Sequence, residues 1–234
     1  MAGCCTPTAY GKLFNRRVAA KDARRYRKRG LTGTARTLAE LAGDVSGATV
    51  LDVGGGIGAI ELELIRAGAL RATNMEISGA YEDEAEKLLA EHGYAGSVDR
   101  RVGDFVADGN TVGEHDIVVL HRVVCCYPDA DALVGEAATH AGRLLLLTYP
   151  QERWYVRAGV RVINVFLRLS GSGFRTYAHP VERIFAAAAR HGLTPTAGER
   201  TGALWESASL SRAGTSAEDA GVPKRVAAGL RPDA

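Results

Sequence analysis

A glycine-rich turn flanked by acidic residues is the part of the sequence best suited to bind a cofactor. In the segment TVLDVGGGIGAIELELI, Asp52 lies at the end of an apolar run, shortly before Gly54, Gly56 and Gly58. Glycines allow a sharp turn and let a ligand approach where a Cβ atom would collide. A helix beginning beyond the turn adds free amide groups. Because Gly54, Gly56 and Ala59 also match the dinucleotide fingerprint GxGxxA, the turn alone does not identify the cofactor.

Two acidic residues later in the chain suit the nucleoside part of such a cofactor. Glu76 ends the second predicted strand, 20 residues after Gly56, where a carboxylate can accept hydrogen bonds from both ribose hydroxyls. Asp104 and Phe105, in the segment VGDF, end the third predicted strand. They offer an acceptor for an adenine amino group and a ring that can flank the base. A ribose-binding carboxylate fits NAD and S-adenosylmethionine alike.

The segment VVLHRVVCCYPD follows the fourth predicted strand with a histidine and an arginine. His121 comes directly after DIVVL, and the carboxyl end of a strand in an open α/β sheet is where ligands bind. Its imidazole suits removal of a proton from an oxygen acid, so we predict a catalytic role. The alternative is that the ring packs against the cofactor or donates to a carbonyl. Arg122 either pairs with an acidic acceptor or faces solvent.

Four cysteines occur as two adjacent pairs, Cys4 with Cys5 and Cys125 with Cys126. Adjacent cysteines lack the CxxC spacing typical of structural zinc sites, so no metal site is predicted. A vicinal disulfide would be strained, which leaves it as a redox switch. Burial as small apolar side chains is a further interpretation. If the two pairs met, four sulfurs would suit a thiophilic acceptor such as trivalent arsenic.

The end of the fourth predicted strand also suits a pocket for a second ligand beside the cofactor, because ligands of open α/β sheets bind at the carboxyl ends of strands. His179 precedes a helix that has a proline in its first turn, which favours a place in the entry loop. The predicted pocket residues are Tyr10, Arg122, Cys125, Cys126 and His179.

A regular alternation of apolar and helical segments is predicted to position these residues. From residue 47 to residue 212, the runs ATVLDV, RATNMEI, HDIVVL, RLLLLTY and WESASLS alternate with helical patterns. This βαβ order predicts an α/β fold with a mainly parallel sheet and helices on both faces. Residues 1–46 are predicted to form a helical cap, with one helix from Lys12 to Arg29, and residues 213–234 a flexible tail.

The balance of charges argues against binding by charge alone. The chain has 29 basic and 27 acidic residues, a net charge of +2. Nine of the basic residues lie between residues 12 and 29, which suggests an RNA path or a solvated helix face. The start of the chain has no basic segment followed by an apolar one, and no long apolar window occurs. We therefore expect a cytoplasmic protein without a transmembrane segment.

A helical insert is predicted at about residues 151–173. Its arginines fall at spacings of 4, 4 and 7 and would form one stripe on a helix, at Arg153, Arg157, Arg161 and Arg168. The residues expected opposite this stripe are Trp154, Val162, Val165, Phe166 and Leu169. This arrangement suggests a flat or apolar acceptor with an acidic group, although ordinary helix packing explains it as well.

Taken together, the glycine motif from Asp52 to Gly58 and the acids Glu76 and Asp104 resemble those of the class I S-adenosylmethionine-dependent methyltransferases. The resemblance covers about residues 47–211. It implies a Rossmann-like sheet of seven strands with an antiparallel last strand, and S-adenosylmethionine across the carboxyl ends of strands one to four. It implies methyl transfer to a small molecule, most simply at oxygen. In layout the chain is distantly similar to magnesium-protoporphyrin and quinone-precursor O-methyltransferases.

Other functions make different demands on the sequence. A short-chain dehydrogenase needs a Tyr-x-x-x-Lys pair, and none of the eight tyrosines has a lysine four residues later. Methyltransferases acting on base amino groups carry Asn or Asp before Pro-Pro after the fourth strand, where this chain has HRVVCCYP. An RNA methyltransferase, a thiol or metalloid methyltransferase and a cofactor-binding protein without turnover stay open as alternatives. The oligomeric state is not predicted.

Overall fold

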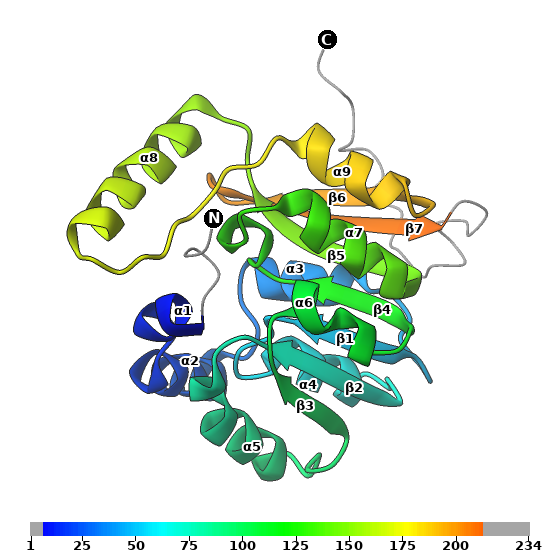
Figure 1. Cartoon of the computed structure of the whole chain (residues 1–234). Helices are drawn as coiled ribbons and strands as arrows, with labels where there is room; N and C mark the ends of the chain where they lie inside the picture. The colour runs from blue at the N-terminus through cyan, green and yellow to red at the C-terminus, as the bar shows by residue number, and fades with distance from the viewer. Residues whose placement is uncertain (1–6, 213–234) are drawn as a thin grey trace.

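The computed structural model describes residues 7–212, which form one seven-stranded sheet with helices on both faces (Figure 1). The strand order is β3-β2-β1-β4-β5-β7-β6, and β7 alone runs antiparallel to the others. The strands are β1 (Thr49–Val53), β2 (Arg71–Glu76), β3 (Val98–Val102), β4 (His115–Leu120), β5 (Ala141–Pro150), β6 (Leu193–Thr201) and β7 (Trp205–Arg212). The predicted fold class, with its antiparallel last strand, is confirmed.

Helices cover the two faces of the sheet and one of its edges. The helices are α1 (Pro7–Leu13), α2 (Arg16–Arg29), α3 (Thr34–Leu41), α4 (Ala59–Arg66), α5 (Glu82–Glu91), α6 (Phe105–Asp108), α7 (Ala130–His140), α8 (Trp154–Leu169) and α9 (Val181–Ala189), with short 3₁₀ turns η1 (Gly79–Tyr81), η2 (Gly109–Thr111) and η3 (Val124–Cys126). Helices α3 and α4 pack on one face, whereas α7 and α9 pack on the other.

The central strands are apolar on both sides because both faces of the sheet are covered. Side chains alternate across a strand, so Val118 and Leu120 of β4 join the core under α7 and α9. Ile117 and Val119 join the second core, under α3 and α4. This double burial explains the near-continuous apolar runs in the sequence.

The basic N-terminal segment folds as two helices instead of the single predicted one. Asn15 interrupts the run and caps α2, since its side-chain oxygen accepts hydrogen bonds from the amides of Arg17 and Val18. Helix α2 buries Ala19 and Ala23 against α4 and α5. The helices α1 and α2 lie beside the carboxyl ends of the strands (Figure 1).

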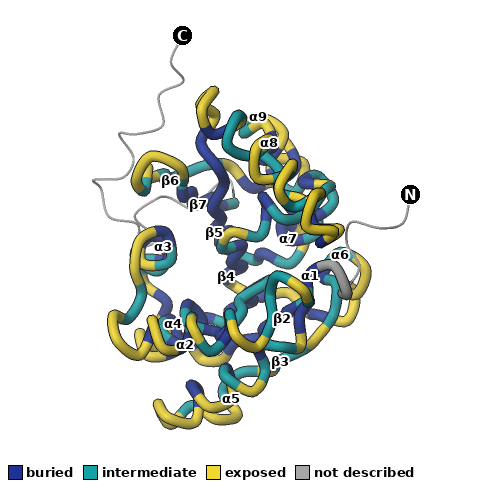
Figure 2. Tube along the Cα trace, turned by 90° about the vertical axis from the view of Figure 1, so that its left-hand side faces the viewer, coloured by how far each residue is buried: buried dark blue, intermediate teal, exposed yellow. Residues whose placement is uncertain are grey.

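Helix α8 lies at the periphery, and its apolar side is exposed (Figures 1 and 2). Of its sixteen residues only Val156 is buried. The interpretation that ordinary helix packing explains this segment is therefore wrong for the apolar residues named with the arginine stripe, which are all exposed: Trp154, Val162, Val165, Phe166 and Leu169. None of the helices in residues 7–212 is long and apolar enough to cross a membrane.

Some predictions concern residues outside the described range. Cys4 and Cys5, the first residues of the predicted cap and the predicted tail at 213–234 are among them. The postulated meeting of the two cysteine pairs therefore stays a prediction.

Candidate functional site

The main cavity of the described residues lies where the strand order reverses, at the carboxyl ends of β1, β2 and β4. Its volume is about 460 Å³. One wall is formed by the glycine turn and the ends of the strands, and the opposite wall by α2 and residues 30–35. In open α/β sheets this reversal point is where ligands bind, because the loops on either side of it diverge. The position of the cavity is thus set by the topology of the sheet.

The backbone of the glycine turn adopts the left-handed conformation at three positions. Gly54, Gly56 and Gly58 have φ angles of +67°, +59° and +75°, in the region that favours glycine. The amide of Gly54 donates to the carbonyl oxygen of Met75 at 2.8 Å, which ties the turn to β2. Gly58 then caps the start of α4. The three glycines of the predicted motif are therefore required by the conformation of the chain.

Three buried acceptor atoms near this turn have no hydrogen-bond partner in the described part of the chain. They are both carboxylate oxygens of Asp52 and the amide oxygen of Asn74. Burial raises the pKa of Asp52 well above its usual value, and the nearby Glu61 raises it further. A buried acceptor without a donor is costly, and Asp52 lines the cavity, so its oxygens suit a ligand that brings donors or positive charge.

Gly55 is a sterically restricted position of the turn that the motif did not identify. A Cβ atom there would collide with Asn74 Nδ2 and lie 2.6 Å from Asp52 Oδ2. Because the φ angle of Gly55 is not in the left-handed region, only space restricts this position. The turn thus packs directly on the buried polar pair.

Replacing Gly55 with alanine is expected to lower the free energy of unfolding by roughly 1–3 kcal/mol and to weaken cofactor binding, since the turn must move off Asp52. The matched control is Gly113→Ala, where a new Cβ atom would meet nothing within 4 Å. Urea denaturation and calorimetric titration with S-adenosylhomocysteine measure both effects. Wild-type behaviour of both variants would contradict the packing described for Gly55.

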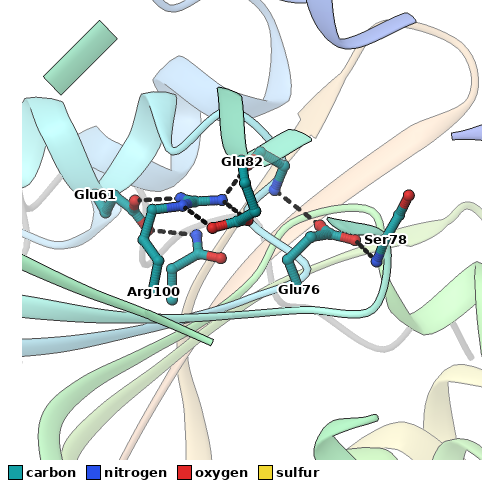
Figure 3. A network of polar contacts seen from close by, with 7 residues as sticks. Glu61, Glu76, Ser78, Glu82 and Arg100 are labelled. Carbon is teal, nitrogen blue, oxygen red and sulfur yellow. Dashed lines mark hydrogen bonds and ion pairs between the residues drawn. The ribbon is translucent and has the colours of Figure 1, made fainter. Parts of the chain in front are cut away.

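Arg100 of β3 forms hydrogen bonds with the glycine turn and with two glutamates near it (Figure 3). The Arg100 guanidinium donates to Glu61 at 3.1 Å, to both carboxylate oxygens of Glu82 at 3.1 and 2.8 Å, and to the carbonyl oxygen of Gly56 at 2.9 Å. Glu61 also accepts a hydrogen bond from Asn74 at 2.5 Å. Burial raises the pKa of Glu61, and the charge of Arg100 opposes that rise. Arg100 therefore compensates the carboxylates that surround the turn.

Glu76 accepts a hydrogen bond from the same turn and lines the cavity. Its two carboxylate oxygens accept hydrogen bonds from the amides of Gly56 at 3.0 Å and Ser78 at 2.9 Å (Figure 3). The carboxylate lines the cavity, and each oxygen can accept a second hydrogen bond. Burial raises its pKa, while the two amides oppose that rise. Glu76 is thus held in one orientation with acceptor capacity left toward the cavity.

The second predicted pair lies in a smaller adjoining cavity of about 50 Å³. Asp104 caps α6 through the amide of Val106, and the hydroxyl of Tyr127 donates to its carboxylate at 3.3 Å. Phe105 lines the same cavity. This cavity shares Tyr10, Gly54 and other lining residues with the larger one, so the two adjoin.

His121 lies on the wall of the large cavity in contact with the N-terminal region. Its Nε2 atom is 2.9 Å from the Thr34 hydroxyl, which also accepts from Arg122 Nε at 3.2 Å. Burial lowers the pKa of His121 to about 3, and the charges of Arg122 and Arg25 lower it further. The ring is therefore uncharged near neutral pH, and its predicted catalytic role stays a prediction.

Arg122 adopts the single left-handed backbone conformation found outside glycine in residues 7–212. Its φ angle is +58°, and its amide donates to the Thr148 hydroxyl at 2.7 Å. The guanidinium lies 4.8 Å from the ring centre of Trp205. Such strain costs about 1–3 kcal/mol and concentrates at functional sites. Arg122 is exposed and lines the cavity, where it contacts Thr34 and Trp205, so its pairing with an acidic acceptor stays a prediction.

The backbone carbonyl oxygens of the two cysteines that follow accept hydrogen bonds from two other segments of the chain. The carbonyl oxygen of Cys125 accepts from the amide of Tyr177 at 2.7 Å, and that of Cys126 accepts from the Tyr10 hydroxyl at 2.7 Å. Their thiols are free, 3.6 Å apart, and both donate to the carbonyl oxygen of Arg122. Cys126 lines both cavities, whereas Cys125 is buried and lines neither.

The predicted pocket residues are thus only partly brought together. Tyr10, Arg122 and Cys126 line the large cavity. His179 lines neither cavity, because its ring stacks on Tyr177 and its Nε2 atom bonds the carbonyl oxygen of Tyr127. In the structure it joins the segment after α8 to the loop after β4.

Comparisons with known proteins support the same fold. The chain has a TM-score of 0.61 to magnesium protoporphyrin IX methyltransferase from Synechocystis PCC 6803 with bound S-adenosylhomocysteine, at 22% identity over 77% of this chain and 82% of that one. It has a TM-score of 0.66 to an O-methyltransferase family protein from Burkholderia thailandensis, at 19% identity over 83% and 58%. The [4+2]-cyclase SpnF is also similar, with a TM-score of 0.58 at 14% identity over 76% and 79%.

These similarities establish the fold of the class I methyltransferases, as the sequence motifs predicted. No protein-family model matches the chain, and no curated relative is similar to it in sequence. The presence of a cyclase among the similar structures means that the fold alone does not fix the reaction. The reaction has to be argued from the residues of the site.

Proposed function

We propose that the protein transfers a methyl group from S-adenosylmethionine to a small-molecule acceptor. The observation that carries this proposal is the pairing of the glycine turn with Glu76 at the strand reversal. The turn leaves room for a ligand at the backbone, and Glu76 keeps acceptor capacity toward the cavity. Two similar structures, those of the Synechocystis enzyme, contain S-adenosylhomocysteine or S-adenosylmethionine, which supports the choice of cofactor.

The residues of the site fit this cofactor on chemical grounds. S-adenosylmethionine supplies a methyl group on a positively charged sulfonium, ready for in-line displacement. Glu76 would bind the ribose hydroxyls, and Asp104 with Phe105 would hold the adenine. Asp52 supplies buried acceptor oxygens without partners, which suits the positively charged end of the molecule. The chain's main task is to orient donor and acceptor and to exclude water.

We further propose that the acceptor is a small molecule methylated at oxygen and bound between His121, Arg122 and Cys126. These three side chains line the cavity on the side away from Glu76's strand, at the end of β4. Arg122 and Arg25 would attract an acidic group of the acceptor. Such an anion would offset the two positive charges that lower the pKa of His121, so binding would make its imidazole a better proton acceptor.

Replacing His121 with alanine is expected to lower turnover roughly 100-fold while leaving cofactor affinity unchanged, because the ring would take part only in the transfer step. Thr34→Val should cause a smaller loss, since it removes the hydroxyl that orients the ring. His191→Ala, just after α9, is the matched control, because His191 lines neither cavity. Turnover of His121→Ala at the wild-type rate would end the proposed role.

The acceptor can be found without knowing its class. An extract incubated with the enzyme and an isotopically labelled methyl donor, then searched by mass spectrometry, should contain a labelled small molecule. Labelled RNA would instead favour the nucleic-acid alternative. That alternative is weakened by α2, where Arg27 pairs with Glu84 and Glu91, and Arg16 pairs with Asp83. Cofactor binding with no labelled product from any extract would favour a protein without turnover.

A further inference from the structure

Helix α8 exposes more apolar surface than any other described helix, and nothing in residues 7–212 covers it. The exposed side chains include Trp154 at 80%, Phe166 at 68% and Leu169 at 79%. The neighbouring turn between β6 and β7 adds Leu204 at 53%. Contiguous apolar surface of this kind marks an interaction site in water-exposed proteins.

The inner side of α8 is already satisfied by its own contacts. Val156 is buried, and the Asn164 side chain exchanges two hydrogen bonds with the backbone of Thr176, at 2.8 and 2.9 Å. The Tyr155 hydroxyl donates to the carbonyl oxygen of Ala203 at 2.9 Å. The helix is therefore fixed to the body in its present orientation, and its apolar side faces outward.

A stripe of arginines borders this apolar side. At about 100° per residue, Arg157, Arg161 and Arg168 fall within about 40° of one another on the helix. The exposed apolar side chains fill the arc directly beside them, so the stripe flanks the apolar face instead of lying opposite it as predicted; they are Trp154, Val162, Val165, Phe166 and Leu169.

All charged side chains of α8 itself are positive. Helix α8 contains no acidic residue, and Arg161 and Arg168 form no ion pair within the described residues. Arg157 pairs with Glu152, which precedes the helix, at 3.1 Å. A partner for this face should therefore have an apolar interior that accepts the apolar side chains and a negatively charged surface that pairs with the arginines.

We propose that α8 docks the protein in the plane of an anionic lipid bilayer. An in-plane helix of this type inserts aromatic and aliphatic side chains at the headgroup boundary while arginines bind lipid phosphates. Trp154 and Tyr155 have the ring types that concentrate at this boundary. Helix α8 projects at the edge of the molecule, where it can reach the flat surface of a bilayer (Figure 1).

A second copy of the chain fits this face less well. A helix of sixteen residues is about 24 Å long and offers a strip on the order of 300 Å², well below the roughly 800 Å² per partner of a stable interface. Pairing two copies of α8 would also bring two arginine stripes together without acids to compensate them.

The segment that follows α8 contacts residues around the cavity, so a helix bound to the bilayer would be joined to the cavity wall by direct contacts. Thr176 and Tyr177, which follow α8, both bond the carbonyl oxygen of Cys125 in the loop after β4. Lys12 of α1 donates to the carbonyl oxygen of Gly171, and Phe174 packs against Tyr10 at 5.4 Å between ring centres. The lipid-binding proposal itself does not depend on the proposed methyl transfer.

Vesicle flotation with the whole protein tests the proposal. Vesicles of phosphatidylcholine with about 30% phosphatidylglycerol should bind the protein, and vesicles of phosphatidylcholine alone should bind it at least roughly tenfold more weakly. The fluorescence of Trp154, which is exposed, should shift to the blue on anionic vesicles. No binding to the anionic vesicles would overturn the proposal.

Matched variants separate α8 from the rest of the surface. Leu169→Ser should lower binding severalfold, whereas Leu70→Ser, at an equally exposed leucine before β2, should not. Arg161→Gln with Arg168→Gln should lower binding to anionic vesicles roughly tenfold or more, and Arg71→Gln with Lys87→Gln should have little effect. Circular dichroism checks that each variant is folded.

Sedimentation velocity without lipid provides the competing outcome. The protein should sediment as the same species in the wild type and in Leu169→Ser. A dimer that Leu169→Ser dissociates, together with equal vesicle binding by Leu169→Ser and Leu70→Ser, would assign the face to a second copy and overturn the lipid proposal.

Discussion

Replacing Arg100 with methionine is expected to lower the free energy of unfolding by about 3–5 kcal/mol. The Arg100 side chain is 7% exposed and its partner Glu61 is fully buried, so the variant leaves a buried carboxylate without its compensating charge. The same change removes the hydrogen bonds from Arg100 to the carbonyl oxygen of Gly56 and to both carboxylate oxygens of Glu82. Urea denaturation at neutral pH measures the loss.

Arg101 offers a matched control in the adjacent position of the same strand. Its side chain is 38% exposed and pairs with Asp99, which is 54% exposed, so Arg101→Met should cost less than about 1 kcal/mol. Equal losses for the two variants would contradict the role given to Arg100.

The effect of Arg100→Met should also depend on pH in a defined direction. The pKa of Glu61 is already raised by burial, and removal of Arg100 raises it further. Above that pKa the folded variant must hold an unpaired charge, and below it the carboxyl group is neutral. The difference in stability between wild type and variant should therefore narrow as the pH falls.

Replacing Glu76 with alanine is expected to weaken the binding of S-adenosylmethionine at least about 100-fold. Two hydrogen bonds from ribose hydroxyls to a carboxylate contribute roughly 3 kcal/mol together, and 1.4 kcal/mol corresponds to a factor of ten. The variant also releases the amides of Gly56 and Ser78, which now fix the turn. Calorimetric titration measures the affinity.

Two further variants show whether the effect belongs to the carboxylate of Glu76. Glu76→Gln keeps the size of the side chain and one acceptor oxygen, so its affinity should lie between those of wild type and Glu76→Ala. Glu86→Ala removes an exposed carboxylate of α5 and should bind like wild type. Unchanged affinity in Glu76→Ala would show that the ribose is held elsewhere.

The sheet and the cofactor side of the site could be predicted because their signals are local in the sequence. The strand β4 ends in an apolar run from Ile117 to Leu120, and the turn from Gly54 to Gly58 follows β1 directly. Glu76 and Asp104 each come at the end of a strand, and parallel strands bring their carboxyl ends to one edge. Pattern and topology together therefore place these residues.

The residues that support the site could not be predicted because their partners are distant in the chain. Arg100 lies in the polar edge strand VDRRV and reaches Glu61, 39 positions away. Thr34 reaches His121 across 87 positions. Neither pair produces a periodic pattern or a characteristic residue spacing in the sequence. The low pKa of His121 could not be predicted for the same reason, since it depends on burial and on Arg25 from α2.

Helix α8 shows a different limit of sequence patterns. A stripe of arginines beside apolar residues predicts a helix correctly, but the same pattern arises whether the apolar side meets the core or leaves it. The exposure of Trp154 and Leu169 could be found only once the rest of the chain was in place.

The binding of S-adenosylhomocysteine is the measurement that tests the central claim most directly. Calorimetric titration of the wild-type protein should give a single site with a dissociation constant on the order of micromolar, and NAD should give no heat of binding at the same concentrations. Absence of S-adenosylhomocysteine binding, or saturable binding of NAD in its place, would contradict the assignment of this cavity to a methyl donor.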